Sequence, residues 1–123
     1  MNGRLYDTSV LLWFLSGDKR LSESVRRSIE DPDEKKYISI VSAWEVAIKI
    51  SLGKLALEGG AETFWRIFKE GGFTGLSVSI EAVKIVQTLP FHHKDPFDRM
   101  LIATAMEHGL ELVTSDEELG QYW

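Results

Sequence analysis

Residues 95–119 read DPFDRMLIATAMEHGLELVTSDEEL, and they set the fold class because they join a well-marked helix to a strand. Asp95 is a side-chain helix cap and Pro96 suits the first helical position, so the pattern predicts a helix that begins here. Gly109 is expected to end that helix, and the apolar residues 112–113 then form a short strand. A helix that leads directly into a strand is typical of the repeating unit of a parallel α/β sheet.

The chain on the N-terminal side repeats this alternation of strands and helices. Strands are expected at residues 4–6, 37–40, 76–78 and 112–113, and helices at residues 8–15, 22–29, 42–52, 62–70, 81–88, 95–109 and shortly after Ser115. This order predicts a single domain over residues 1–123, a three-layer α/β/α sandwich with a central parallel sheet of four to five strands.

The composition is that of an ordinary globular domain. The 123 residues carry a formal net charge of −5 and include no cysteine. The lack of cysteine excludes disulfides and thiolate metal sites, and it is typical of a cytoplasmic protein. No apolar run reaches about 18 residues, so no transmembrane helix is expected. Nucleic-acid-binding proteins usually have a basic excess, so the charge argues mildly against that class unless a metal site accounts for part of the acidity.

Four acidic residues lie at junctions between predicted strands and helices: Asp7, Glu45, Asp98 and Asp116. Because the carboxyl ends of parallel strands meet at one crevice, we expect these acids to lie close together in space. A pocket of carboxylates suits a hard cation such as Mg²⁺ or Mn²⁺, and such a cation suggests phosphate chemistry.

Each acid also has a simpler explanation as a helix cap. Ser42 and Glu45 have the spacing of a capping box, in which the glutamate reaches back to the amide of the cap residue. Asp98 is the third residue of the helix that Asp95 caps, where its charge favours the helix dipole. If all four acids are caps, the chain is a non-catalytic interaction module.

Two of the four acids are expected to face the core, which favours a functional role over capping. Apolar residues at helical spacing accompany both acids: Trp44, Ile48 and Leu52 beside Glu45, and Ile102, Ala105 and Met106 beside Asp98. A carboxylate beside a buried stripe is costly unless it is hydrogen-bonded or coordinates a cation.

Small hydroxyl side chains flank the outer two acids. Thr8 follows Asp7, and Thr114 and Ser115 precede Asp116. Hydroxyls at such positions can orient a carboxylate or a metal-bound water, so these three residues are expected to support the metal ligands.

Three basic side chains are candidate contacts to a substrate phosphate: Arg99, His93 and Lys49. Lys49 lies one turn after Glu45, so an ion pair along the helix is its default role. A zinc site is not expected, because the chain has three histidines and no cysteine to serve as ligands.

Three segments together resemble PIN-domain proteins. LYDTSVLLWFL resembles the family's opening strand, which ends in Asp followed by Thr or Ser, and SAWEVAIKISLGKL resembles the second block with its Glu on a helix. HHKDPFDRMLIATAMEHGLELVTSDEEL is similar to the third and fourth blocks, in the branch of VapC-type toxins with a His-His-x-Asp-Pro-Phe-Asp-Arg motif. The resemblance spans Leu5 to Leu119.

This resemblance implies a PIN-like sandwich and a Mg²⁺- or Mn²⁺-dependent endoribonuclease, the toxin of a toxin–antitoxin pair. The family's catalytic and metal-binding quartet falls on Asp7, Glu45, Asp98 and Asp116. The resemblance also implies RNA as the substrate, a homodimer, and inhibition by a cognate antitoxin. Ser9 stands where His is more frequent, a departure that is not expected to affect metal binding.

Overall fold

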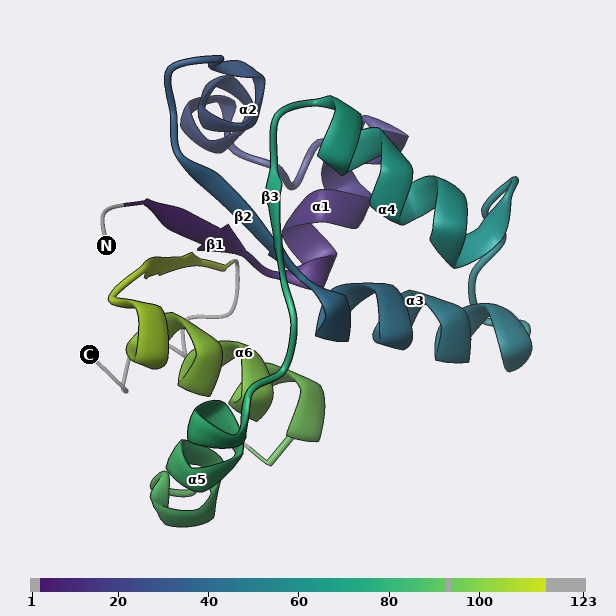
Figure 1. Cartoon of the computed structure of the whole chain (residues 1–123). Helices are drawn as coiled ribbons and strands as arrows, with labels where there is room; N and C mark the ends of the chain where they lie inside the picture. Colours follow the sequence, from purple (N-terminus) through teal and green to yellow (C-terminus); the bar gives the residue numbers. More distant parts are fainter. Residues whose placement is uncertain (1–2, 93, 115–123) are drawn as a thin grey trace.

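The computed structural model of the chain describes residues 3–92 and 94–114. In chain order its elements are β1 (Arg4–Tyr6), α1 (Thr8–Ser16), α2 (Glu23–Glu30), β2 (Lys36–Ser39), α3 (Ile40–Ser51), α4 (Gly60–Glu70), β3 (Thr74–Leu76), α5 (Ile80–Thr88), α6 (Pro96–His108) and β4 (Glu111–Val113) (Figure 1). The predicted alternation is confirmed over this part of the chain. The helix expected after Ser115 lies outside the described residues.

The described strands form one sheet with the order β3-β2-β1-β4, and every neighbouring pair is parallel. Leu5 in the central strand β1 is in register with Tyr37 on one side and Leu112 on the other. All strands therefore point the same way, so their carboxyl ends form a single edge. The segments that leave this edge are the N-terminal turns of α1 and α3 and the residue after β4.

Two hydrophobic clusters cover the two faces of the sheet, and adjacent residues of β1 belong to different clusters. Tyr6 packs with side chains of α1, α2 and α4, whereas Leu5 packs mainly with side chains of α6. This separation follows from the alternation of side chains along a strand. Figure 1 shows α5 and α6 together on one side and α1 and α4 on the other, which confirms the predicted α/β/α sandwich.

The start of α3 differs from the prediction. The hydroxyl of Ser39 accepts a hydrogen bond from the backbone N–H of Val41 at 3.1 Å, so Ser39 is the cap and Ile40 is the first helical residue. The prediction that Ser42 caps this helix is therefore wrong, and so is the inclusion of Ile40 in the preceding strand. Ser39 and Ser42 both suit the cap position. Ser39 is the cap because β2 ends there and the helix begins at the next residue.

The third strand begins two residues earlier than predicted, at Thr74 instead of Leu76. Gly75 weakens the strand signal in the sequence, because glycine is unfavourable inside a strand. Its presence has a packing reason: a Cβ atom at this position would lie 2.6 Å from the ring of Trp65 on α4. The tryptophan ring occupies the space that a side chain would need.

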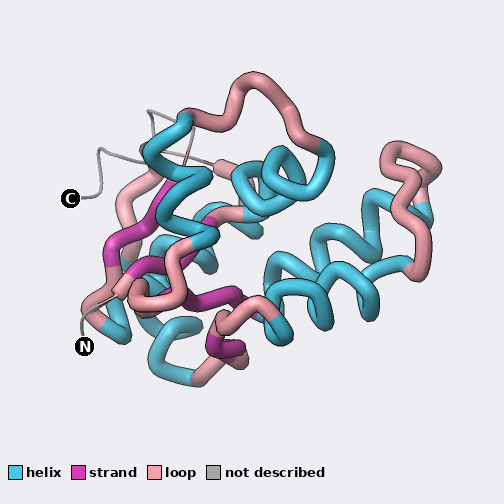
Figure 2. The backbone as a smooth tube through the Cα atoms, turned by 90° about the horizontal axis from the view of Figure 1, so that it is seen from above, coloured by secondary structure: helices cyan, strands magenta, loops and turns pink. Residues whose placement is uncertain are grey.

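The expected inward stripes are only partly correct. Ile102 and Ala105 of α6 are fully buried as predicted, but Met106 is exposed, and so are Trp44 and Leu52 of α3. Helix α3 has no fully buried side chain after Val46, because its C-terminal part extends beyond the sheet alongside α4 (Figures 1 and 2).

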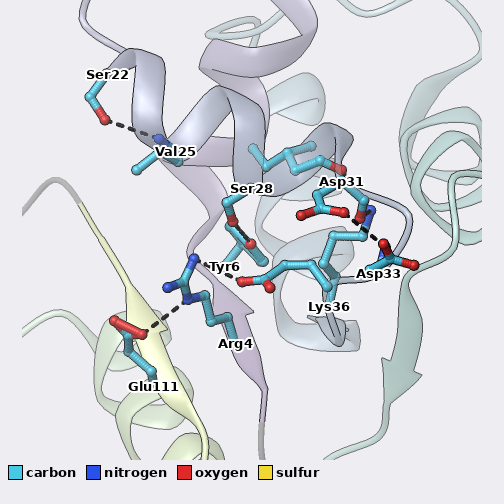
Figure 3. Close-up of polar contacts among 11 residues, drawn as sticks. Arg4, Tyr6, Ser22, Val25, Ser28, Asp31, Asp33, Lys36 and Glu111 are labelled. Carbon is cyan, nitrogen blue, oxygen red and sulfur yellow. Dashed lines mark hydrogen bonds and ion pairs between the residues drawn. The ribbon is translucent and has the colours of Figure 1, made fainter.

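Basic side chains fasten the opposite edge of the sheet, at the amino ends of the strands. Arg4 pairs with Glu34 at 2.9 Å and with Glu111 at 3.1 Å (Figure 3). The ammonium of the buried Lys36 donates to the backbone carbonyls of Ile29, in the last turn of α2, and of Asp31, the residue that follows the helix. These contacts give Arg4 and Lys36 a structural role at this edge of the sheet.

None of the helices in the described ranges combines the length and the apolar character that a membrane crossing requires.

Candidate active site

Asp7 lies at the carboxyl end of β1 and is almost completely buried, with 5% of its surface exposed. One carboxylate oxygen, Oδ1, accepts from the backbone N–H of Val10 at 2.8 Å, so Asp7 caps α1. The other oxygen, Oδ2, accepts from the hydroxyl of Thr114, directly after β4. The side chain is therefore held between two neighbouring strands by a hydroxyl that orients its carboxylate, and the role of Thr114 beside a metal ligand stays a prediction.

A hydroxyl pair joins the first turns of α1 and α3. Thr8 Oγ1 donates to Ser42 Oγ at 2.9 Å, and both residues are buried. Thr8 directly follows Asp7, and Ser42 lies one turn before Glu45, so this contact fixes the separation of the two acids. The sequence suggests Ser42 as a cap and gives no sign of its buried contact with Thr8.

Glu45 has an unusual environment for a helix carboxylate, with only 13% of its side chain exposed. Its Oε2 pairs with the ammonium of Lys49 at 3.2 Å, which confirms the default role of that lysine. Its Oε1 is buried and has no hydrogen-bond partner among the described residues. A buried carboxylate oxygen without a donor is costly, so its position requires a compensating interaction such as a cation.

Asp98 is the third residue of α6, as predicted. Asp95 caps this helix by accepting from the backbone N–H groups of Phe97 and Asp98 at 2.8 and 3.1 Å. The ring of Phe97 packs edge-on against Trp44, with 4.9 Å between the ring centroids. Because Phe97 precedes Asp98 and Trp44 precedes Glu45, this aromatic contact joins α6 to α3 beside both acids.

The turn that carries Glu45 thus contacts both the turn of Asp7, through Thr8 and Ser42, and the turn of Asp98, through Trp44 and Phe97. Within residues 3–92 and 94–114, no three His, Asp or Glu side chains lie close enough together to hold a metal ion between them. The fourth predicted acid, Asp116, lies outside the described residues, as do Ser115 and His93.

The prediction that Arg99 contacts a substrate phosphate is contradicted by its position. Only 5% of this residue is exposed. Its guanidinium group donates to the backbone carbonyls of Val86, Leu89 and Pro90 at 3.2, 3.0 and 3.0 Å. These carbonyls lie at and beyond the end of α5, where helices leave acceptors unsatisfied. Arg99 therefore fastens α5 to α6 inside the protein.

Comparisons with known proteins agree with the fold and with the family resemblance. A family model described as "PIN domain" matches residues 4–122. "Ribonuclease VapC22" of Mycobacterium tuberculosis is 31% identical over 116 residues, which cover 94% of this chain and 88% of that protein.

Two solved structures have the same fold at lower sequence identity. One is described as a toxin–antitoxin complex from Klebsiella pneumoniae; it has a TM-score of 0.65 and 21% identity, and the match covers 93% of this chain and 87% of that one. The other is described as VapBC2 from Rickettsia felis bound to a DNA fragment from their promoter. Its TM-score is 0.71 at 12% identity, with 99% of this chain and 93% of that chain covered.

Proposed function

We propose that this chain, which belongs to the PIN-domain family, is a metal-dependent endoribonuclease that acts as the toxin of a toxin–antitoxin pair. The relative with 31% identity over nearly the whole chain is named a ribonuclease, which supports the reaction class. The structural feature that carries the proposal is the buried Oε1 of Glu45, which has no partner among the described residues and lies one turn from the Thr8–Ser42 contact.

The residues present fit a hard divalent cation, because they supply carboxylate oxygens, one of which is unsatisfied. Asp7, Asp98 and Asp116 would hold Mg²⁺ or Mn²⁺, and Glu45 would either bind the ion or accept the proton of the attacking water. When bound, the ion would acidify that water and offset charge on the phosphate. Val10 and Thr114 keep the Asp7 carboxylate oriented by hydrogen bonds to its two oxygens.

The alternative of a non-catalytic module is weakened by the position of Glu45. Asp7 caps a helix, and Asp98 occupies the third position of another, so either residue alone suits the simpler explanation. Glu45 does not, because the cap of α3 is Ser39 and Glu45 lies in the second turn. Its burial is left unexplained if the acids serve only as caps.

The proposed activity is tested by incubating the purified protein with a broad set of RNAs. We expect cleavage with Mg²⁺ or Mn²⁺, none with EDTA, and recovery when the metal is restored. Hydrolysis by a metal-activated water is expected to leave a 5′-phosphate on the downstream fragment, which end-specific ligation would detect. Cleavage that persists in EDTA would contradict a metal-dependent mechanism.

A thermal titration separates the metal site from the caps-only alternative without measuring cleavage. Binding to the folded state alone stabilises by RT ln(1 + [L]/Kd), so Mn²⁺ at about a hundred times its Kd should add about 2.7 kcal/mol. We expect the melting temperature to rise with Mn²⁺ concentration and to saturate. A Glu45→Gln variant should show a reduced rise, whereas Glu62→Gln on the exposed surface of α4 should match the unmodified protein.

The partners follow from the same comparisons. One similar structure is described as a toxin–antitoxin complex and another as VapBC2, so we propose that a cognate antitoxin binds and inhibits this chain. A homodimer is proposed as well, and the exposed rings of Trp44 and Phe91 are suitable contacts for it. An RNA substrate places the protein in the cytoplasm.

A further inference from the structure

A hollow of about 280 Å³ adjoins Asp7 on the side of α1 and α2. It is lined by Val10, Trp13, Arg20, Leu21, Ser22, Val25 and Thr114. Two of these residues, Val10 and Thr114, also donate the hydrogen bonds that hold the Asp7 carboxylate. The hollow is therefore lined by residues that contact the acid that the proposed reaction requires.

Arg20 stands at the rim of this hollow in a fixed orientation. Its Nε and NH2 groups donate to the two carboxylate oxygens of Asp18 at 3.1 and 2.8 Å, and its guanidinium carbon lies 4.5 Å from the centroid of the Trp13 ring. The side chain is nevertheless 68% exposed, and its NH1 group donates to none of the described residues. The hydrogen bonds from Arg20 lower the pKa of Asp18 to about 2, so the pair stays charged at any physiological pH.

A second hollow, of about 290 Å³, continues from the first between α1 and residues 55–57. Trp13 and Arg20 line both hollows, so the arginine stands where they meet. The other arginines with described contacts differ: Arg99 is buried, Arg4 lies at the opposite edge of the sheet, and Arg26 pairs with Glu23 and lines neither hollow. In a chain of net charge −5, an exposed guanidinium group beside the hollow can contact a phosphate directly, although Asp18 offsets its charge at longer range.

We propose that Arg20 binds a phosphate of single-stranded RNA next to the scissile bond, with the adjoining nucleotide in the hollow beside Thr114. This inference rests on the proposed ribonuclease function. Asp18 holds one edge of the guanidinium group, through Nε and NH2, and the NH1 donors remain for a phosphate oxygen, which arginine binds through charge-assisted hydrogen bonds. The contact orients the strand, so that the next phosphate reaches Asp7.

The test measures binding of a short fluorescent single-stranded RNA of randomised sequence by anisotropy. All proteins carry Asp7→Asn to prevent cleavage, and the salt concentration is varied. Arg20→Gln is expected to raise the Kd about five- to ten-fold, because one charge-assisted contact is lost. The slope of log K against log salt should fall by about 0.7, the value for one phosphate contact on a single strand.

Arg4→Gln is the matched control, because it removes an arginine that carboxylates also hold beside a hollow at the opposite edge of the sheet. It should leave the Kd within about two-fold and the slope unchanged. Arg20→Lys should keep the slope but bind about two- to three-fold more weakly, because lysine lacks the planar fork. Thermal melts of each variant confirm that the fold is retained.

The two proposals fail in different ways. If the unmodified protein neither binds nor cleaves RNA, the ribonuclease proposal is wrong and the role of Arg20 falls with it. If it cleaves RNA but Arg20→Gln binds as tightly as Arg4→Gln, only the role of Arg20 is overturned. Weaker binding to the antitoxin with unchanged RNA binding would likewise overturn it, by assigning the hollow to a protein partner.

Discussion

Replacing Asp7 by Asn is expected to lower the rate of RNA cleavage by about 10³-fold or more. The substitution removes the negative charge that would hold the metal, and a metal contributes several kcal/mol to stabilising the transition state. Since each 1.4 kcal/mol corresponds to a factor of ten, a loss of about 4 kcal/mol gives this magnitude. The measurement is single-turnover cleavage of an end-labelled RNA at saturating Mg²⁺.

The same substitution should leave the fold intact, which makes the loss of activity interpretable. Asparagine caps helices as well as aspartate does, so the bond to the backbone N–H of Val10 can be kept. Thr114 can accept a hydrogen bond from the amide instead of donating one to the carboxylate. We expect a melting temperature within a few degrees of the original, and a rise if repulsion among the acids is relieved.

Asp95→Asn is the matched control, because Asp95 also caps a helix of this domain and lies outside the acidic quartet. It should reduce cleavage less than about two-fold, since an asparagine cap retains the hydrogen bonds to Phe97 and Asp98. Equal losses of activity in the two variants would show that Asp7 acts as a cap and not as a ligand.

The fold was predictable where local chemistry fixes the backbone. Asp95 and Pro96 begin α6 and Gly109 ends it in the left-handed conformation, as expected from those residues alone. The predicted element bounds are wrong where contacts between residues far apart in the sequence determine the backbone. Gly75 lies in a strand because Trp65 packs over it, and the sequence does not show that contact.

The site was predictable to the same degree. The position of Asp7 after the first strand follows from topology, whereas its hydrogen bond with Thr114 was not predicted and arises because β1 and β4 are neighbours in the sheet. The direction of a basic side chain does not follow from its neighbours in sequence. Arg99 directly follows Asp98 in the chain, but its side chain is buried. Arg20 has no acid of the quartet near it in the sequence, yet its side chain lines the hollow beside Thr114.

Replacing Arg99 by Met is expected to destabilise the protein by about 2–4 kcal/mol. Methionine keeps much of the apolar volume but removes the donors to the carbonyls of Val86, Leu89 and Pro90. Each buried acceptor left without a partner costs about 1–3 kcal/mol, and access of water to the exposed Pro90 reduces the sum. Urea unfolding followed by circular dichroism gives the change in free energy.

The part of the protein that loses stability in Arg99→Met distinguishes a structural role of Arg99 from the phosphate contact that the sequence suggested. Because Arg99 fastens the end of α5 to α6, amide hydrogen exchange should accelerate most in α5. Lys94→Met removes an exposed cation from the adjoining loop and should change stability by less than about 0.5 kcal/mol. If Arg99→Met instead left stability unchanged and weakened RNA binding, the buried arginine would have to leave its carbonyls to reach substrate. Breaking three hydrogen bonds for one phosphate contact is unfavourable, so we expect the loss in stability.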